Sequence, residues 1–323
     1  MKISTFKKEN LNFIEVSNDS NLKVVFCDLG ASIFNIYFHD ELMTRNVKYI
    51  KDFKIKNCYY GKTIGRTSNR LKGHFCKIDD KAYELLNNEG DNVLHGGTDG
   101  LSNQLFNYYY LESDEYVDLI FSYLSPNLES GYPGNVDVKV SYRIYKKIDQ
   151  LDVNYYAKTD AKTTFSLTNH AFFCLGDTDL TNLKLFINSS KNLDVNRKDL
   201  LPIRVIKNND VMNFKEFKNI NKDIENNYLK GKMMNGYDSY FYFDDVDINK
   251  VNVSLKNQKY QLDIKTDFEG VQIYSSNYKP DFELDNKNNY RDSVAIEPSD
   301  SFLNINLLDV DQIYSRNISY VFK

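Results

Sequence analysis

Two of the four histidines have neighbours that suit proton transfer. His95 stands between the apolar pair 93–94 and the glycine pair 96–97, and His170 follows Thr168 and Asn169. An imidazole titrates near neutral pH, so a histidine among hydrogen-bonding residues at the end of an apolar run can act as a general acid or base. We therefore expect chemistry at His170. The residues alone leave one alternative open, a buried histidine whose ring bonds Thr168 or a backbone carbonyl.

Other reactive groups are less well placed. Cys174 lies four residues after His170, but its apolar surroundings favour a buried structural thiol over a nucleophile. The segment 61–63 reads Gly-Lys-Thr, yet a phosphate-binding loop also needs a glycine at position 56, which is Lys56. The four cysteines lack C-x-x-C spacing, so we expect reduced thiols and no metal site.

Regular alternation of apolar and polar residues predicts the strands that must position these groups. It is clearest over residues 117–124, 136–144 and 151–157, and it returns over 183–187. Two further runs, 251–255 and 260–264, flank a predicted hairpin turn at 256–259. No window keeps a helical stripe, and residues 214–228 are predicted to be a short helix or a loop. The pattern indicates an all-β chain, built as one large antiparallel sandwich.

Composition narrows the functional classes. The 323 residues are 41% hydrophobic with a formal net charge of −4, and no basic block is present that would follow a phosphate backbone, so nucleic acid is not an expected partner. No segment approaches the roughly 18 apolar residues of a membrane span, and residues 1–10 lack an apolar signal. We expect a cytoplasmic protein, a monomer or homodimer, with a single domain over residues 1–323.

Five further segments combine flexible backbone with functional groups, at 65–70, 131–134, 236–238, 270–274 and 294–298. Their order, together with Leu94-His95-Gly96-Gly97 and Thr168-Asn169-His170, resembles the galactose mutarotase or aldose 1-epimerase family from about residue 61 to residue 302. The resemblance implies a β-supersandwich fold. It also implies interconversion of the α and β anomers of a free aldohexose such as galactose or glucose, with no metal or organic cofactor.

The resemblance also assigns roles to individual residues. Ring opening needs a base that takes the proton of the C1 hydroxyl and an acid that protonates the ring oxygen. By their places in the family's motifs, Glu297 is the base and His170 the acid. His95 would polarise the ring oxygen and position the sugar, with the glycines after it allowing close approach of the backbone.

The remaining motif residues would bind the sugar. Asn69 and Arg70 would donate to hydroxyls, Asp238 would accept from two of them, and Gln272 would make a further contact. The sequence leaves open whether Arg66 replaces Arg70 as the main sugar contact. An aromatic ring against the apolar face of the sugar would come from one of three residues near the motifs: Phe172, Phe173 and Tyr274. The segment 131–134 is predicted to be a rigid turn that shapes the rim of the cleft.

Departures from the family leave the preferred sugar open. Ser299 and Asp300 stand where many members carry Thr-Gln or a similar pair, and the segment 104–106 replaces a Trp-containing stretch. A hexose-6-phosphate epimerase of the same fold remains an alternative, because four basic residues could hold a phosphate. These are Lys62, Arg66, Arg70 and Lys72. A non-catalytic carbohydrate-binding module is another alternative, whereas a glycosidase would need a second carboxylate beside the bond.

Overall fold

Antiparallel strands make up most of the chain, as described by a computed structural model that covers residues 1–286 and 290–323. The all-β prediction is confirmed. The largest sheet has nine strands, in the order β12 (Asn107–Glu112), β13 (Tyr116–Ser125), β14 (Val136–Tyr145), β15 (Gln150–Thr159), β29 (Tyr314–Phe322), β25 (Gln261–Thr266), β24 (Val253–Lys256), β19 (Lys184–Ile187) and β22 (Lys218–Asn219).

Two other sheets complete the main framework. A seven-stranded sheet runs in the order β21 (Pro202–Lys207), β20 (Lys191–Val195), β23 (Asp238–Tyr242), β26 (Gly270–Tyr274), β27 (Val294–Ser299), β18 (Phe172–Phe173) and β6 (Thr44–Arg45). A five-stranded sheet runs from β1 (Lys2–Lys8) through β2 (Leu11–Ser17), β3 (Leu22–Cys27) and β4 (Ser32–Phe38) to β5 (Glu41–Leu42).

Short elements connect these sheets. Four two-stranded ribbons pair β7 (Thr63–Ile64) with β17 (Thr168–Asn169), β8 (Arg70–Leu71) with β11 (Val93–Leu94), β9 (Phe75–Ile78) with β10 (Lys81–Glu84), and β16 (Thr163–Thr164) with β28 (Leu307–Leu308). The helical elements are α1 (Ile50–Phe53) and the 3₁₀ turns η1 (Leu101–Asn103), η2 (Glu129–Gly131), η3 (Ile220–Lys222) and η4 (Asn227–Leu229).

The long strands form where the sequence alternates. In β14 every second residue from Val136 to Ile144 is buried, because successive side chains of a strand point to opposite faces. The predicted hairpin is also present, with β24 and β25 paired antiparallel across the turn at 256–259. Residues 214–228 hold η3, η4 and the two-residue strand β22, so the prediction of a short helix or a loop agrees with the structure.

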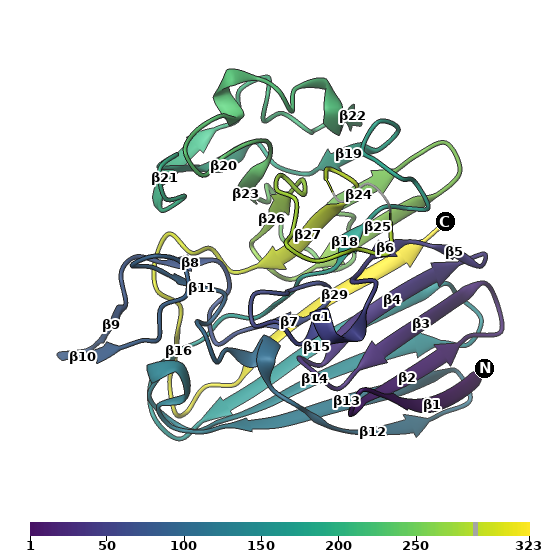
Figure 1. Cartoon of the computed structure of the whole chain (residues 1–323), viewed down its shortest axis with the longest axis horizontal. Helices are drawn as coiled ribbons and strands as arrows, with labels where there is room; N and C mark the ends of the chain where they lie inside the picture. Colours follow the sequence, from purple (N-terminus) through teal and green to yellow (C-terminus); the bar gives the residue numbers. More distant parts are fainter. Residues whose placement is uncertain (287–289) are drawn as a thin grey trace.

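One hydrophobic core joins the sheets. Strands β2–β4 lie in front of β13–β15 in Figure 1, and one cluster of buried apolar side chains takes residues from both layers. The ring of Phe26 in β3 lies 4.7 Å from that of Tyr142 in β14. The same cluster includes Ile296 of the seven-stranded sheet, so that sheet is held against the nine-stranded one. Within the described residues, no helix is long and apolar enough to cross a membrane.

Candidate active site

A cleft of about 670 Å³ lies beside the seven-stranded sheet. The seven side chains to which the sequence motifs assigned catalytic or sugar-binding roles line this cleft, although they come from segments up to 228 residues apart, from 69 to 297. The structure therefore brings the predicted site residues together, and these are Asn69, Arg70, His95, His170, Asp238, Gln272 and Glu297.

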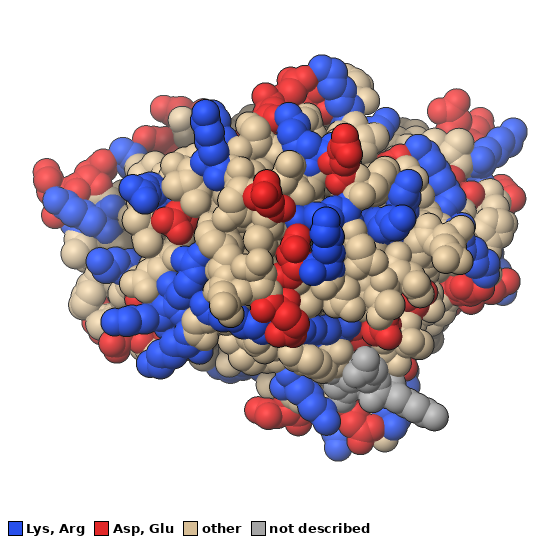
Figure 2. All heavy atoms as spheres, turned by 90° about the horizontal axis from the view of Figure 1, so that it is seen from above, with Lys and Arg blue, Asp and Glu red and all other residues tan. Residues whose placement is uncertain are grey.

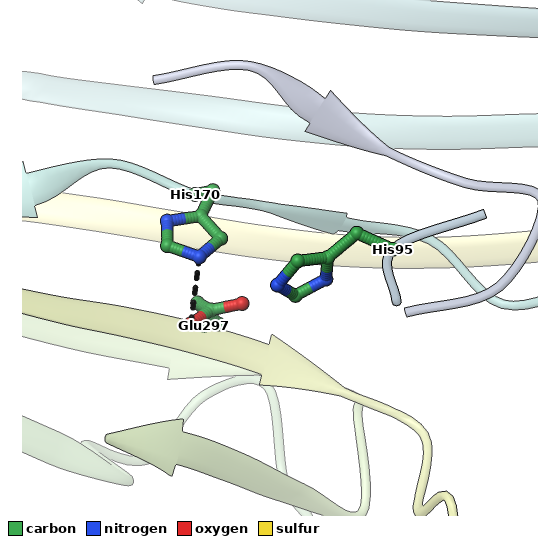
Figure 3. Close-up of side chains that lie close together, drawn as sticks. All are labelled: His95, His170 and Glu297. Atoms are coloured by element: carbon green, nitrogen blue, oxygen red, sulfur yellow. Dashed lines mark ion pairs between the residues drawn. The ribbon is translucent and has the colours of Figure 1, made fainter. Parts of the chain in front are cut away.

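Sheet register places His170 opposite Glu297. Strand β18 pairs with β27 so that Phe172 faces Ala295, and the same antiparallel register continued by two residues sets His170 against Glu297. Both side chains are buried, and His170 Nε2 lies 3.4 Å from Glu297 Oε1 (Figure 3). A short movement of either group would allow a proton to pass between them.

The backbone of His170 is held on both sides. Its N–H donates to the carbonyl of Lys62 at 3.0 Å, and its carbonyl accepts from the N–H of Gly61 at 2.9 Å. Thr168 does not bond the imidazole, because its hydroxyl donates to the carbonyl of Pro298 at 2.8 Å. Among the described residues, His170 Nδ1 has no hydrogen-bond partner, so the structure differs from the alternative of a ring satisfied by packing.

His95 reaches the same point from the opposite wall. Strands β8 and β11 pair Leu94 with Arg70, and the next pair in register joins the His95 N–H to the Asn69 carbonyl at 3.0 Å. The His95 ring is perpendicular to the His170 ring, with 5.1 Å between centroids. Tyr59 contacts both imidazoles, with its ring 4.8 Å from His95 and 5.9 Å from His170.

The glycines after His95 serve the protein backbone. Gly96 has a φ of +86°, and a Cβ there would lie 1.9 Å from the carbonyl oxygen of Gly65; a Cβ on Gly97 would lie 2.3 Å from that of Leu86. Neither glycine lines the cleft. They allow a close approach of the backbone, as expected, and what the His95 loop approaches is the backbone at Gly65 and Leu86.

This packing makes Gly96 a critical position for stability. We expect Gly96→Ala to lower the free energy of unfolding by about 3 kcal/mol, because the added Cβ is sterically blocked and the backbone has a positive φ. Gly90→Ala is the matched control, since Gly90 also has a positive φ of +59° but no other atom lies within 4 Å of the place that a Cβ would occupy. That control should lower the free energy of unfolding, measured by urea denaturation, by about 1 kcal/mol. Equal losses in the two variants would contradict the steric explanation.

Arg70 is fixed between two carboxylates. Its Nε and Nη2 donate to the two oxygens of Glu89 at 2.7 and 2.9 Å, while its Nη1 lies 4.0 Å from Asp238 Oδ2. Asp238 also accepts from Gln272 Nε2 at 2.5 Å. These groups form a row of donors and acceptors along the wall of the cleft, the type of surface that binds sugar hydroxyls.

Burial dominates the ionisation of the cleft. It raises the pKa of Glu297 well above its usual range, and the charge of Asp238 raises it further. It lowers the pKa of His170 to about 4 and that of His95 well below the value for exposed histidine, where His170 and Arg70 add to the effect. Burial therefore favours the neutral forms of both side chains in the dyad of His170 and Glu297, an uncharged imidazole and a protonated carboxyl group.

Several buried polar atoms in the cleft have no hydrogen-bond partner within the described part of the chain. Such atoms are costly in a folded protein unless a ligand or water satisfies them. They belong to residues that the motifs proposed for the site: Asn69 Nδ2, His95 Nδ1, His170 Nδ1, Gln272 Oε1 and Glu297 Oε2.

His95, His170 and Glu297 also have the residue types of a metal site, and their candidate ligand atoms lie within 4.8 Å of one another. Tetrahedral zinc, with bonds of about 2.0–2.1 Å to nitrogen and oxygen, holds its ligand atoms only about 3.4 Å apart. At least one side chain would have to move before all three could reach a single ion. As placed, they do not form a preformed tetrahedral metal site.

Arg66 lies outside the cleft lining. Its guanidinium is buried and donates to the carbonyls of Ser125, Pro126 and Pro133 at 2.8–2.9 Å. Of the two arginines that the sequence left open, Arg70 is therefore the one in the cleft. The segment 131–134 does not line the cleft either, so its prediction as a rim turn is wrong; it holds Arg66 instead.

The aromatic candidates also differ in whether they line the cleft. Phe172 and Tyr274 line the cleft and can contact a sugar, whereas Phe173 packs in the main core, where its ring lies 5.4 Å from that of Tyr320.

All four cysteines are free and buried, as expected. Burial raises the pKa of the Cys174 thiol to about 12, which leaves it unreactive at neutral pH.

Tyr59 and Glu89 are cleft residues that sequence reasoning missed. Tyr59 lies in the loop before β7, two residues before Gly61. Glu89 lies in the turn before β11 and His95. Neither belongs to an alternating run or a motif of known chemistry. The sequence therefore carries no local signal that would have identified either residue.

Comparison with known proteins identifies relatives of this chain in sequence and in fold. The chain is 37% identical over 135 residues to the galactose mutarotase of Sus scrofa, a match that covers 42% of this chain and 37% of that protein. It is 26% identical over 280 residues to the aldose 1-epimerase of Haemophilus influenzae, covering 82% of this chain and 78% of the relative.

Solved structures show the same fold. The galactose 1-epimerase of Lactobacillus acidophilus superposes with a TM-score of 0.90 at 22% identity, over 100% of this chain and 98% of that one. A family model described as aldose 1-epimerase matches residues 12–320, almost the whole sequence. The resemblance carried by the motifs is thereby confirmed, and the chain belongs to the aldose 1-epimerase family.

Proposed function

We propose that the protein is an aldose 1-epimerase that interconverts the α and β anomers of a free aldohexose such as galactose or glucose. The observation that carries this proposal is the buried pair of His170 and Glu297, 3.4 Å apart in a cleft lined with hydroxyl-binding groups. An acid and a base that share one proton are what ring opening and closure require.

In the proposed reaction, Glu297 as the carboxylate takes the proton of the C1 hydroxyl while His170 as the imidazolium protonates the ring oxygen. The bond from C1 to the ring oxygen breaks and an open-chain aldehyde forms. After rotation about the C1–C2 bond the two residues exchange roles, and the ring closes on the other face. One proton enters and one leaves the sugar in each direction, so no cofactor or net proton is consumed.

The resting and reactive forms of the dyad hold the same number of protons. Burial favours neutral His170 and protonated Glu297, and transfer of that proton across 3.4 Å produces the imidazolium and the carboxylate. His95 stays neutral because burial lowers its pKa, so it can donate one hydrogen bond to the ring oxygen without adding charge.

This proton count predicts the pH dependence of kcat/KM. The one-proton dyad gains a second proton, and loses activity, only as pH falls through the lowered pKa of His170 at about 4. An exposed imidazole would instead give an acid limb near pH 6.5. The initial rate of anomer exchange, measured from pH 3.5 to 8 at low sugar concentration, should therefore stay flat through pH 6. A fall in kcat/KM as the pH is lowered, centred at or above pH 6.5, would contradict the assignment of a lowered pKa to His170.

Of the four basic residues that suggested a hexose-6-phosphate substrate, three do not line the cleft, and the fourth, Arg70, is paired with Glu89. Lys62 is buried and donates to the carbonyl of Phe53 at 2.8 Å, Arg66 is tied to carbonyls outside the cleft, and Lys72 does not line it.

On the face shown in Figure 2, basic and acidic side chains are interspersed, a distribution that gives no support to a nucleic acid partner.

Anomer exchange followed by NMR tests the proposal and its alternatives together. Magnetisation transfer between the α and β C1 protons would be measured for galactose, glucose and their 6-phosphates. We expect the protein to raise the exchange rate above that in buffer for at least one free hexose. We expect it to accelerate the 6-phosphates less than that free hexose. Acceleration of the phosphates alone would favour the phosphate epimerase. Sugar binding without acceleration of any substrate would favour a non-catalytic module and end the proposal.

A further inference from the structure

Glu89 holds Arg70 by the edge of the guanidinium that faces away from Asp238. The two bonds, 2.7 Å to Nε and 2.9 Å to Nη2, use both carboxylate oxygens, and this bidentate geometry fixes the plane of the guanidinium. Nη1 stays free of Glu89, and within the described residues no hydrogen bond from it is present.

Arg70 and Asp238 are neighbours in the cleft but do not hydrogen-bond to each other. Nη1 of Arg70 and Oδ2 of Asp238 lie 4.0 Å apart, too far for a hydrogen bond. A charged donor and a charged acceptor thus stand side by side without satisfying each other. Each can bond one of two adjacent hydroxyls, which a closed ion pair between them could not do.

The segment that carries Glu89 is built to keep this arrangement. Glu89 and Asn92 exchange two backbone hydrogen bonds, at 3.0 and 3.2 Å, around Gly90. The Asn92 side chain accepts from the N–H of Gly73 at 3.0 Å, and that of Asn88 bonds both the N–H and the carbonyl of Leu94. The carboxylate therefore stands on a turn that is hydrogen-bonded to Leu94 of β11 and to Gly73, two residues beyond the end of β8.

We infer that Glu89 is a positioning residue for sugar binding, which keeps Arg70 and Asp238 apart so that both remain available to neighbouring hydroxyls. This role rests on the proposed function, because it needs a sugar in the cleft. Without the second carboxylate bond, the guanidinium turns toward Asp238 and the two charges pair with each other. The sugar then has to break that pair in order to bind.

Kinetics of Glu89→Gln test this role. We expect KM for the preferred hexose to rise about tenfold with kcat changed less than about threefold, because the interaction lost is made equally in the ground and transition states. Asp91→Asn is the matched control, since it removes a carboxylate from the same turn that does not line the cleft, and it should leave KM unchanged. Glu89→Asp, which keeps the charge on a shorter side chain, should give an intermediate KM.

A double-mutant cycle separates positioning from a structural effect. If Glu89 acts through Arg70, then Glu89→Gln should raise KM no further once Arg70→Ala is present. Additive effects in the cycle, or an unchanged KM in Glu89→Gln, would overturn the inference. Its failure is distinct from failure of the proposed function, because the latter would appear as absence of anomer exchange in the unmodified protein.

Discussion

Replacing Glu297 by glutamine is expected to lower kcat for anomer interconversion by about 10²–10⁴-fold, the usual contribution of a general base. Gln keeps the size of the side chain and one carbonyl oxygen but cannot accept the proton of the C1 hydroxyl. It also removes the proton that the dyad shares with His170. The measurement is kcat from NMR exchange under saturating sugar.

Sugar binding and folding should survive this change. Gln has nearly the same volume as Glu and adds no charge to this buried position, so the fold should be retained. Near-normal sugar affinity and an unchanged denaturation midpoint would therefore assign the loss to chemistry. A Glu297→Gln protein that exchanges anomers at more than about a tenth of the original kcat would remove the carboxylate from the mechanism.

Replacing His170 by asparagine is the second change with a large expected effect, a loss in kcat of about 10²–10³-fold. Asn can still form hydrogen bonds but has no proton to give to the ring oxygen. The backbone bonds of residue 170 to the carbonyl of Lys62 and the N–H of Gly61 do not involve the side chain, so the local structure should persist. The comparison is of kcat and of sugar affinity with the parent protein.

Two controls make the His170 result specific. His74→Asn removes an imidazole outside the cleft lining and should leave kcat unchanged. The double variant of His170→Asn with Glu297→Gln should lose about as much as the worse single variant, because residues that act as one unit are not additive. Multiplied losses in the double variant would mean that the two side chains act independently.

The long strands and the fold class could be predicted from sequence because their signal is local. The alternation of β13, β14 and β15 follows from one buried face and is readable residue by residue. The short strands beside Arg70, His95 and His170 are different. β7, β8, β11, β17 and β18 each have two residues, too few for any period to show, and they form because long-range partners fix them.

The same distinction explains the candidate site. The motif order identified seven cleft residues, but not which arginine lines the cleft. Arg66 and Arg70 lie in one motif, and Arg66 is held away from the cleft by carbonyls distant in sequence, such as that of Pro133. Glu89 and Tyr59 carry no local signal, since their importance depends on contacts with Arg70, His95 and His170 that exist only in the folded chain.

The central claim is that His170 and Glu297 together catalyse the interconversion of anomers. Polarimetry of freshly dissolved α-galactose and α-glucose tests it most directly. The account predicts that optical rotation approaches equilibrium with a first-order rate constant that rises in proportion to protein concentration for at least one of the two sugars. It also predicts that the His170→Asn and Glu297→Gln variants give nearly the rate of buffer. A rate equal to buffer with the unmodified protein, or equal acceleration by the variants, would contradict it.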